Sequence, residues 1–321
     1  MTRIMMLGLT TVDVVHVHTD AVRPNEKVRA EHQFLAAGGP AANAAVLAAA
    51  LGFETHLVTA LGVHPLAQLV RADLQDHGVR LHDVAADASG PPPLSLVRLA
   101  TASAERSVSS LNDGALAEHC VPTRDPALAT LLLGADAVLI DGYYPELLDA
   151  YHAQLAGHDH LVIDLGSWKE SYAPLLAHAA IVAASADATL PEGGDLLLAL
   201  MERGARVAVQ TAGADPVRAA WREGEPNGPL ARQAPRDGAR ALHRESVPVP
   251  QVEARDTLGA GDVFHGALTA SLAARPHDPL TSHLTFAARL AALRCRHLGP
   301  RTYLAHVPSA RGGAAPTSHP S

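Results

Sequence analysis

Hydrophobic and polar residues form short blocks along the chain, and these blocks predict strands and helices that follow one another. Apolar runs typical of buried strands occupy residues 3–9, 55–62, 137–141, 160–166, 179–185 and 206–213. Apolar segments of helical length occupy residues 38–52, 65–77, 262–274 and 281–298. Strands joined by helices pair in parallel, and the helices cover the sheet. The pattern therefore predicts a three-layer α/β fold with a mostly parallel sheet and helices on both faces.

Two further regions have a different pattern and predict a small β lid. Residues 27–35 alternate, and the side chains on one face of this half-exposed strand are Val28, Ala30, His32 and Phe34. Residues 94–99 and 105–111, joined by "ATASA", predict a hairpin. These segments have no place in a parallel sheet, so we predict a lid built from about residues 14–36 and 93–112.

The remaining segments predict one domain with a short tail. Residues 216–250 are rich in Pro, Gly and Arg and predict an irregular or hairpin excursion. Residues 309–321 have low complexity and predict a disordered tail. We find neither an internal repeat nor a clear linker, and we therefore assign residues 1–308 to a single domain.

Composition excludes several classes of function. No apolar run reaches the ~18 residues of a membrane span, and the N-terminus is typical of a strand and not of a signal peptide. Cys120 and Cys295 are far apart, which favours reduced thiols and a cytoplasmic protein. The net charge is −8 without a long basic block, so we expect no nucleic acid partner.

The 19 histidines do not have the spacing of a metal site. His16 and His18, in "HVHTD", fit the edge of a strand. We therefore assign no metal ligand.

The stretch "RDTLGAGDVFHG", residues 255–266, places glycines directly before a predicted helix. Such a turn aims several backbone N–H groups at one point, and the helix dipole adds partial positive charge there. Gly259 and Gly261 permit the close approach of an anion. Asp262 either caps the helix or accepts a proton from a hydroxyl that attacks the bound group.

Asn43 and Asp141 are polar residues in apolar surroundings. Asn43 lies within "GGPAANAAVLAAALG", where an unpaired amide would be costly, so we expect a ligand or a backbone partner. Asp141 follows a buried strand at its carboxyl end, where ligands gather in such sheets. A role as a helix cap explains Asp141 equally well.

Three motifs together carry a resemblance to a known family. "DTLGAGDVFHGAL" resembles the C-terminal signature of the ribokinase-like, pfkB-type carbohydrate kinases, and "GGPAANAAVLAAALG" resembles their N-terminal signature. "AERSVSSLND" is similar to the lid segment of that family. The order of the motifs and the alternating topology agree across residues 3–308. "GGPAA", "GDVFHGAL" and "FAARLAALRC" resemble most the branch of ketohexokinases and sulfofructose kinases.

The resemblance implies transfer of the γ-phosphoryl group of ATP to a hydroxyl of a small sugar, with Mg²⁺ bridging the phosphates and a ketose-like acceptor favoured. Asp262 takes the role of catalytic base, and the backbone of Gly259, Ala260 and Gly261 forms the anion hole. The residues implied to bind the acceptor are Asp13, at the end of the first strand, Gly39, Asn43, Lys27, Asn112 and Asp141. Those implied to bind the nucleotide are Ser185, Thr211, Gly213 and Thr257.

Of the implied roles, that of Lys27 has an alternative. Lys27 matches a lysine that contacts the sulfonate in the sulfofructose-kinase branch, but a solvated edge lysine is the other interpretation. The resemblance leaves open whether Asp256 and Thr257 offer oxygens to a monovalent cation, K⁺. It also implies a homodimer formed through the lid.

The sequence departs from the family pattern at the nucleotide and acceptor sites. Ser185 and Ala188 stand where the family often has Asn-x-x-Glu, which organises Mg²⁺. Pro216 replaces the last glycine of a nucleotide-binding motif, and Pro40 stands where ribokinases have Lys and ketohexokinases have Asn. A nucleoside kinase, with Tyr143 and Tyr144 as stacking platforms, and a non-catalytic sugar or nucleotide sensor are the alternatives. A dinucleotide oxidoreductase is a further alternative, but this chain lacks the GxGxxG motif that such an enzyme has after its first strand.

Overall fold

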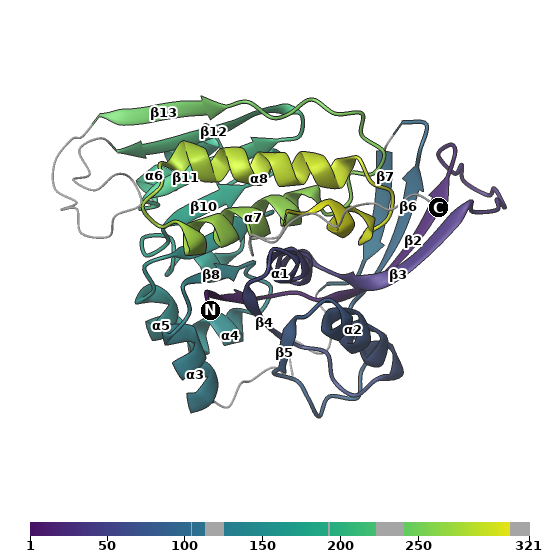
Figure 1. The fold of residues 1–321 in the computed structure, drawn as a ribbon, viewed down its shortest axis with the longest axis horizontal. Helices are drawn as coiled ribbons and strands as arrows, with labels where there is room; N and C mark the ends of the chain where they lie inside the picture. Colours follow the sequence, from purple (N-terminus) through teal and green to yellow (C-terminus); the bar gives the residue numbers. More distant parts are fainter. Residues whose placement is uncertain (104, 113–124, 192, 223–240, 309–321) are drawn as a thin grey trace, which may run out of the picture.

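A sheet of nine strands forms the centre of the molecule (Figure 1). The structure, a computed structural model, describes residues 1–103, 105–112, 125–191, 193–222 and 241–308. The strands, in their order across the sheet, are β13 (Leu242–Val247), β12 (Asp215–Arg222), β11 (Val207–Ala212), β10 (Ile181–Ala184), β9 (Leu161–Leu165), β8 (Ala137–Ile140), β1 (Arg3–Leu7), β4 (Glu54–Thr59) and β5 (Arg80–Asp83). In this sheet, all neighbouring strands from β11 through to β5 pair in parallel. At the other edge, β12 pairs antiparallel with β11 and with β13.

Helices pack on both faces of this sheet because its strands alternate their apolar side chains between two cores. In β1, Ile4 and Met6 point into one core and Met5 and Leu7 into the other. The helices of the first core are α1 (Pro40–Ala50), α2 (Pro65–Asp76), α7 (Ala260–Ala274) and α8 (Leu280–Cys295). The helices of the second core are α3 (Pro126–Leu133), α4 (Pro145–Ala150), α5 (His152–Ala156) and α6 (Leu196–Glu202). The predicted three-layer α/β fold is confirmed.

A second sheet forms a lid beside the carboxyl ends of the central strands, at the right of Figure 1. Its strands, in order, are β3 (His32–Gly38), β2 (Thr11–His18), β6 (Leu94–Ala100) and β7 (Glu105–Ser110). On the inner face, Val15 and Val97 belong to a small apolar cluster that also includes Leu258 and Leu298. The lid therefore packs against the segments on either side of α7 and α8.

Several predicted elements shift in the structure. The strand predicted at residues 27–35 begins only at His32, and residues 27–30 form no strand. The strand at Thr11–His18 was predicted only in part, as a lid segment from about residue 14 with the edge of a strand at "HVHTD". It pairs with β3 and β6, so it is covered on both edges. The excursion at residues 216–250 contains the hairpin of β12 and β13, and residues 223–240 lie outside the described residues.

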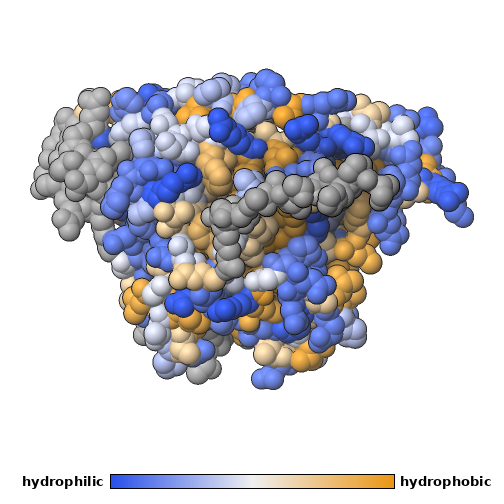
Figure 2. Space-filling model, viewed as in Figure 1, coloured by the Kyte–Doolittle hydropathy of each residue, from blue (hydrophilic) through white to orange (hydrophobic). Residues whose placement is uncertain are grey.

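The described surface is mostly hydrophilic on the face shown in Figure 2, with hydrophobic residues in the middle of the view. None of the helices in the described part of the chain is both long and apolar enough to cross a membrane. The predicted tail, residues 309–321, and Cys120 lie outside the described residues.

Candidate active site

The loop at residues 259–261 has the geometry of an anion site. Gly259 is the N-cap of α7 and adopts a left-handed φ of 72°, which favours glycine. The helix begins at Ala260, so the N–H groups of its first turn have no partner within the helix. A Cβ built on Gly261 would meet no atom within 4 Å. Gly261 therefore borders open space at the positive end of the α7 dipole, whereas the N–H of Ala260 donates to the carbonyl of Thr257 at 3.3 Å.

Asp262 does not cap α7. Gly259 fills the N-cap position, and the Oδ2 of Asp262 instead accepts a hydrogen bond of 2.7 Å from the Nδ2 of Asn43 in α1. Asp262 is half-buried, and a Cβ on Gly259 would lie 3.5 Å from its carboxylate. The carboxylate thus lies beside the anion loop and is held from the opposite helix.

The amide of Asn43 has a different partner from the one expected. We expected a ligand or a backbone group, but its Oδ1 accepts a hydrogen bond of 3.1 Å from Nη1 of Arg301. The Nη2 of Arg301 binds Asp73 at 2.8 Å and also donates to the carbonyl of Ala37. Because a guanidinium can only donate, it fixes the amide with Oδ1 toward Arg301 and Nδ2 toward Asp262.

Sequence reasoning missed Arg301 and a second pair behind Asp262. The Nδ1 of His265 lies 2.9 Å from the Oδ2 of Asp164, and both side chains are buried. His265 follows Asp262 by three residues on α7, and Asp164 is the penultimate residue of β9. Burial lowers the pKa of His265, but the carboxylates of Asp164 and Asp262 raise it by more, so the net shift is upward. A polar residue in an apolar helix was the only sequence signal for His265.

Burial and the nearby Asp164 carboxylate raise the pKa of Asp262 to about 6. If Asp262 is the base, only its ionised form accepts a proton. We expect kcat/KM to be constant above pH ~7 and to fall about tenfold per pH unit below the pKa of the free enzyme. Initial rates between pH 4.5 and 8.5, with thermal unfolding recorded in the same buffers, test this. A profile without a break near this pKa, in a protein that stays folded, would contradict it.

Asp13 lies in β2 of the lid and not, as predicted, at the end of the first strand. Its buried carboxylate accepts a hydrogen bond of 2.6 Å from the Oγ1 of Thr11. Burial raises its pKa, while hydrogen bonds from Thr11 and Ser95 oppose the shift. A Cβ on Gly38 would overlap this carboxylate, at 2.0 Å from its carbon, so the glycine makes room for it.

Asp13, Asn43 and Gly259 line one small cavity, so the structure brings three predicted residues together. The other residues that line it are Leu258, Val263, Arg294, Pro300 and Tyr303. Gly39 is the N-cap of α1, with a φ of 91° and no room for a Cβ beside the carbonyl of Leu9.

Asp141 has a structural role in addition to any ligand. Its buried carboxylate accepts hydrogen bonds from the backbone N–H groups of Leu9 at 2.8 Å, Ala41 at 3.3 Å and Tyr143 at 3.2 Å. Burial raises its pKa to about 7. The alternative of a capping role is thus the one that the geometry favours, since this carboxylate joins the end of β1 to the start of α1.

Asn112 contacts the region of Asp141, whereas Lys27 has no described contact with the site residues. Asn112 is half-buried after β7, and its side chain forms a hydrogen bond with Tyr143, which follows Asp141. The charge of Asp262 raises the pKa of Tyr143, after the larger effects of burial, Asp141 and Asp164, so Tyr143 and Asn112 belong to the same region. Lys27 is exposed in the segment before β3.

The predicted nucleotide residues lie at strand ends and in the loop before α7. Ser185 follows β10, Thr211 lies in β11, and Gly213 has a φ of 60° in the turn to β12. The Oγ1 of Thr257 accepts a hydrogen bond of 2.7 Å from Nη1 of Arg106, which lies in lid strand β7. The lid thus contacts the loop that precedes the anion site.

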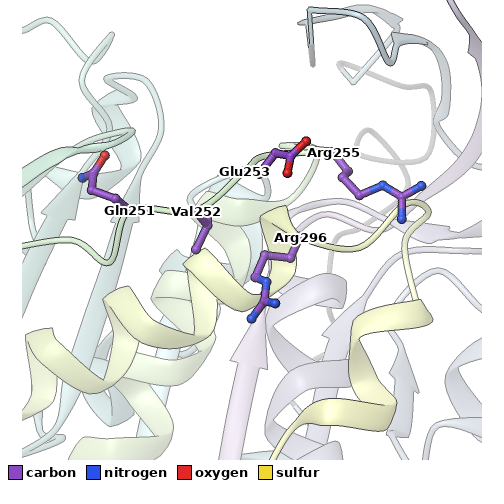
Figure 3. Close-up of a pocket in the computed structure, with 5 residues that line it drawn as sticks. All are labelled: Gln251, Val252, Glu253, Arg255 and Arg296. Carbon is purple, nitrogen blue, oxygen red and sulfur yellow. The ribbon is translucent and has the colours of Figure 1, made fainter.

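A cleft of about 610 Å³ opens above the end of α8 (Figure 3). Its lining residues are Gln251, Val252, Glu253, Arg255 and Arg296. The Nε2 of Gln251 donates to the carbonyl of Ala214 at 3.0 Å, so the cleft lies beside the turn that contains Gly213.

The residues present offer little to a metal ion by themselves. Among the described residues, no group of three or more His, Cys, Asp or Glu side chains is placed to hold one. Ala188 is buried, and the hydroxyl of Ser185 donates to the carbonyl of Gly166. Mg²⁺ in kinases is bound largely through the phosphates and water, so the site fits an ion that arrives with the nucleotide.

A monovalent cation does not fit at Asp256. The carboxylate of this residue is fully buried and already pairs with the guanidinium of Arg294 at 2.9 Å. The same guanidinium donates to the carbonyl of Asp256. The oxygens that K⁺ would need are therefore taken.

The fold has three layers and a β lid, and Asp262 lies at the start of a helix that is capped by glycine. This arrangement is that of a sugar or nucleoside kinase. Solved structures share the fold. A candidate ribokinase from Agrobacterium tumefaciens is 24% identical, with a TM-score of 0.76 over 96% of this chain and 95% of that one. The adenosine kinase of Sinorhizobium meliloti is 18% identical, with a TM-score of 0.70 over 95% and 98%.

A third similar structure is the ribokinase of Arabidopsis thaliana in complex with ribose and ATP, which is 17% identical with a TM-score of 0.66 and covers 96% of each chain. The family model of the pfkB family carbohydrate kinases matches residues 1–306. The chain belongs to the pfkB family of carbohydrate kinases. The predicted family and enzyme class are confirmed.

Proposed function

We propose that this protein transfers the γ-phosphoryl group of ATP to a hydroxyl of a small sugar or sugar derivative, with a ketose-like acceptor favoured. One observation carries the proposal: the carboxylate of Asp262 lies beside the anion loop and is oriented by Asn43. In phosphoryl transfer the protein positions the groups and stabilises charge, and a carboxylate accepts the proton of the attacking hydroxyl. The N–H groups of residues 259–261 would hold the transferring phosphoryl group.

The acceptor would bind between the lid and α1. Asp13 and Asn43 line the small cavity here, and Gly39 lies at the start of α1. Asp13 would accept hydrogen bonds from sugar hydroxyls. The Oδ1 of Asn112 is buried and has no partner among the described residues, which leaves it free for a hydroxyl. Asp141 would not contact the acceptor directly but would hold the backbone of the site in place.

The nucleotide would extend from the anion loop past Thr257 toward Ser185, Thr211 and Gly213, with the cleft of Figure 3 beside it. The proximity of Gln251 to Ala214 supports this path. Mg²⁺ would supply charge neutralisation between the phosphates. The contact of Arg106 with Thr257 supports a lid that closes on the phosphates, where an arginine fits bidentate binding.

A panel of acceptors tests the proposal. Turnover of Mg-ATP should be stimulated by at least one ketose or related sugar, and the product should be a sugar phosphate by mass spectrometry. Neutral and acidic sugars compared side by side would also decide whether Lys27 matters, because an anionic acceptor should gain affinity from it. ATP binding without turnover on any sugar would instead favour the sensor.

The nucleoside kinase alternative has less support than the sugar kinase. The Nζ of Lys169 lies 4.1 Å from the centre of the Tyr143 ring, and Tyr144 is buried. Lys169 thus covers one face of the Tyr143 ring, and the Tyr144 ring is shielded from solvent, which leaves little room for a base to stack. Nucleosides in the same panel are expected to give no turnover.

The lid also supports a homodimer in a cytoplasmic protein. On its outer face, Val14 pairs with Leu35 on one side and Leu96 on the other, and the two leucines are 49% and 52% exposed. Such a row of exposed apolar side chains on a sheet favours association. We expect Leu96→Asp to convert a dimer to a monomer in light scattering, with Leu133→Asp, an exposed leucine on α3, as the control. A wild type that is monomeric, or a dimeric Leu96→Asp, would contradict this.

A further inference from the structure

The buried ion pair between Arg294 and Asp256 has no role in the function described so far. Arg294 lies in the last turn of α8 and is 2% exposed, and Asp256 is 0% exposed. Burying an ion pair costs desolvation free energy, and an apolar pair of similar size in its place often makes a protein as stable or more stable. Stability alone is therefore a poor explanation for this pair.

The pair connects the anion loop to the end of α8. One oxygen of Asp256 accepts a hydrogen bond of 2.9 Å from the N–H of Leu258, directly before Gly259. The other oxygen accepts from Arg294 and from the N–H of Gly299, both at 2.9 Å. One buried carboxylate thus fixes the start of the loop to the end of α8.

Among the described residues, every hydrogen-bond acceptor of the guanidinium is an oxygen atom. Besides the carboxylate, Nη1 of Arg294 donates to the carbonyl of His297 at 2.8 Å and more weakly to the carbonyl of Asp256 at 3.4 Å. The ring of Tyr303 lies 5.7 Å from the guanidinium carbon, a cation–π distance. A carboxylate with backbone carbonyls is a ligand set typical of hard cations. Here a side chain of the protein itself occupies it.

We propose that Arg294 is a built-in cation that holds the phosphate-binding loop in place, so that the enzyme needs no monovalent metal ion. A K⁺ ion at these oxygens would lie against the guanidinium, and two like charges repel strongly in a buried site. Arg294 is a positioning residue, because it acts through Asp256 and the loop. This inference rests on the proposed kinase function.

Measurements in salts of different monovalent cations test the role proposed for Arg294. Thermal unfolding and turnover of the wild type are measured in chloride salts of K⁺, Na⁺ and tetramethylammonium at equal ionic strength, and we expect no difference. Arg294→Ala opens the oxygen cage and leaves Asp256 unpaired, which should lower the Tm by roughly 5–10 °C in tetramethylammonium. K⁺ should then raise the Tm of this variant and recover turnover at least about fivefold, since it binds only the folded state.

Two further variants complete the test. Arg294→Ala/Asp256→Asn lacks the carboxylate and should not respond to K⁺, and it also serves if the single variant does not fold. Arg289→Ala, at an exposed position of the same helix, should behave as the wild type. A wild type selectively stabilised or activated by K⁺, or a folded Arg294→Ala that is indifferent to K⁺, would overturn the proposal. The unfolding measurements decide this even if no acceptor is phosphorylated, which would count only against the kinase function.

Discussion

Asp262→Asn is expected to lower turnover at least ~10²-fold, the usual contribution of a positioned general base. The amide keeps the shape of the side chain but cannot accept the proton of the acceptor hydroxyl. Asn43 donates to the carboxylate at 2.7 Å, and an amide oxygen can still accept that bond. The variant should therefore keep its Tm and its affinity for ATP.

Steady-state kinetics with saturating Mg-ATP, together with calorimetric binding of ATP, measure the two quantities separately. Asp149→Asn, an exposed carboxylate on α4 across the sheet, is the matched control and should leave both unchanged. An Asp262→Asn enzyme with a wild-type rate would remove Asp262 from the role of base.

The second large effect is expected at the crossing of α1 and α7. A Cβ on Gly266 would lie 2.8 Å from backbone atoms of Ala44, so Gly266→Ala must push the two helices apart. Overpacking of this kind costs about 1–3 kcal/mol, more than the gain in helix propensity from alanine. Asn43 precedes Ala44, so the same shift separates it from Asp262. Because displacements near 1 Å cost up to ~10²-fold in rate, we expect both the Tm and turnover to fall.

Thermal unfolding and kcat are the measurements, and Gly90→Ala is the control. A Cβ at Gly90 meets no atom within 4 Å, and its φ lies outside the left-handed region, so this variant should match the wild type. If Gly266→Ala keeps full activity, the distance between α1 and α7 does not set the geometry of the base.

Local sequence was sufficient wherever neighbours along the chain form the feature. The turn at Gly259 and the start of α7 are contiguous, so glycines followed by an apolar helix predicted both the anion loop and the position of Asp262. The apolar runs of β1, β8 and β9 predicted central strands for the same reason, because their side chains are buried on both faces. Where burial depends on distant partners, prediction was weaker. The mixed pattern at residues 11–18 concealed the full extent of β2, whose side chains are covered only after β3 and β6 pair with it.

The sequence by itself determined the α/β fold, the family and the catalytic candidate, because periodicity and contiguous motifs encode them. The tertiary structure alone decided how the site is held. Asn43 and Arg301 are 258 positions apart, and Asp256 and Arg294 are 38 apart, yet each pair is in hydrogen-bond contact. Neither arginine carries a local signal, since a guanidinium in a helix or loop is usually solvated. Only the packing of α8 and the lid against the segments around α7 excludes solvent from the two guanidinium groups. Arg294 then pairs with Asp256, and Arg301 donates to Asn43.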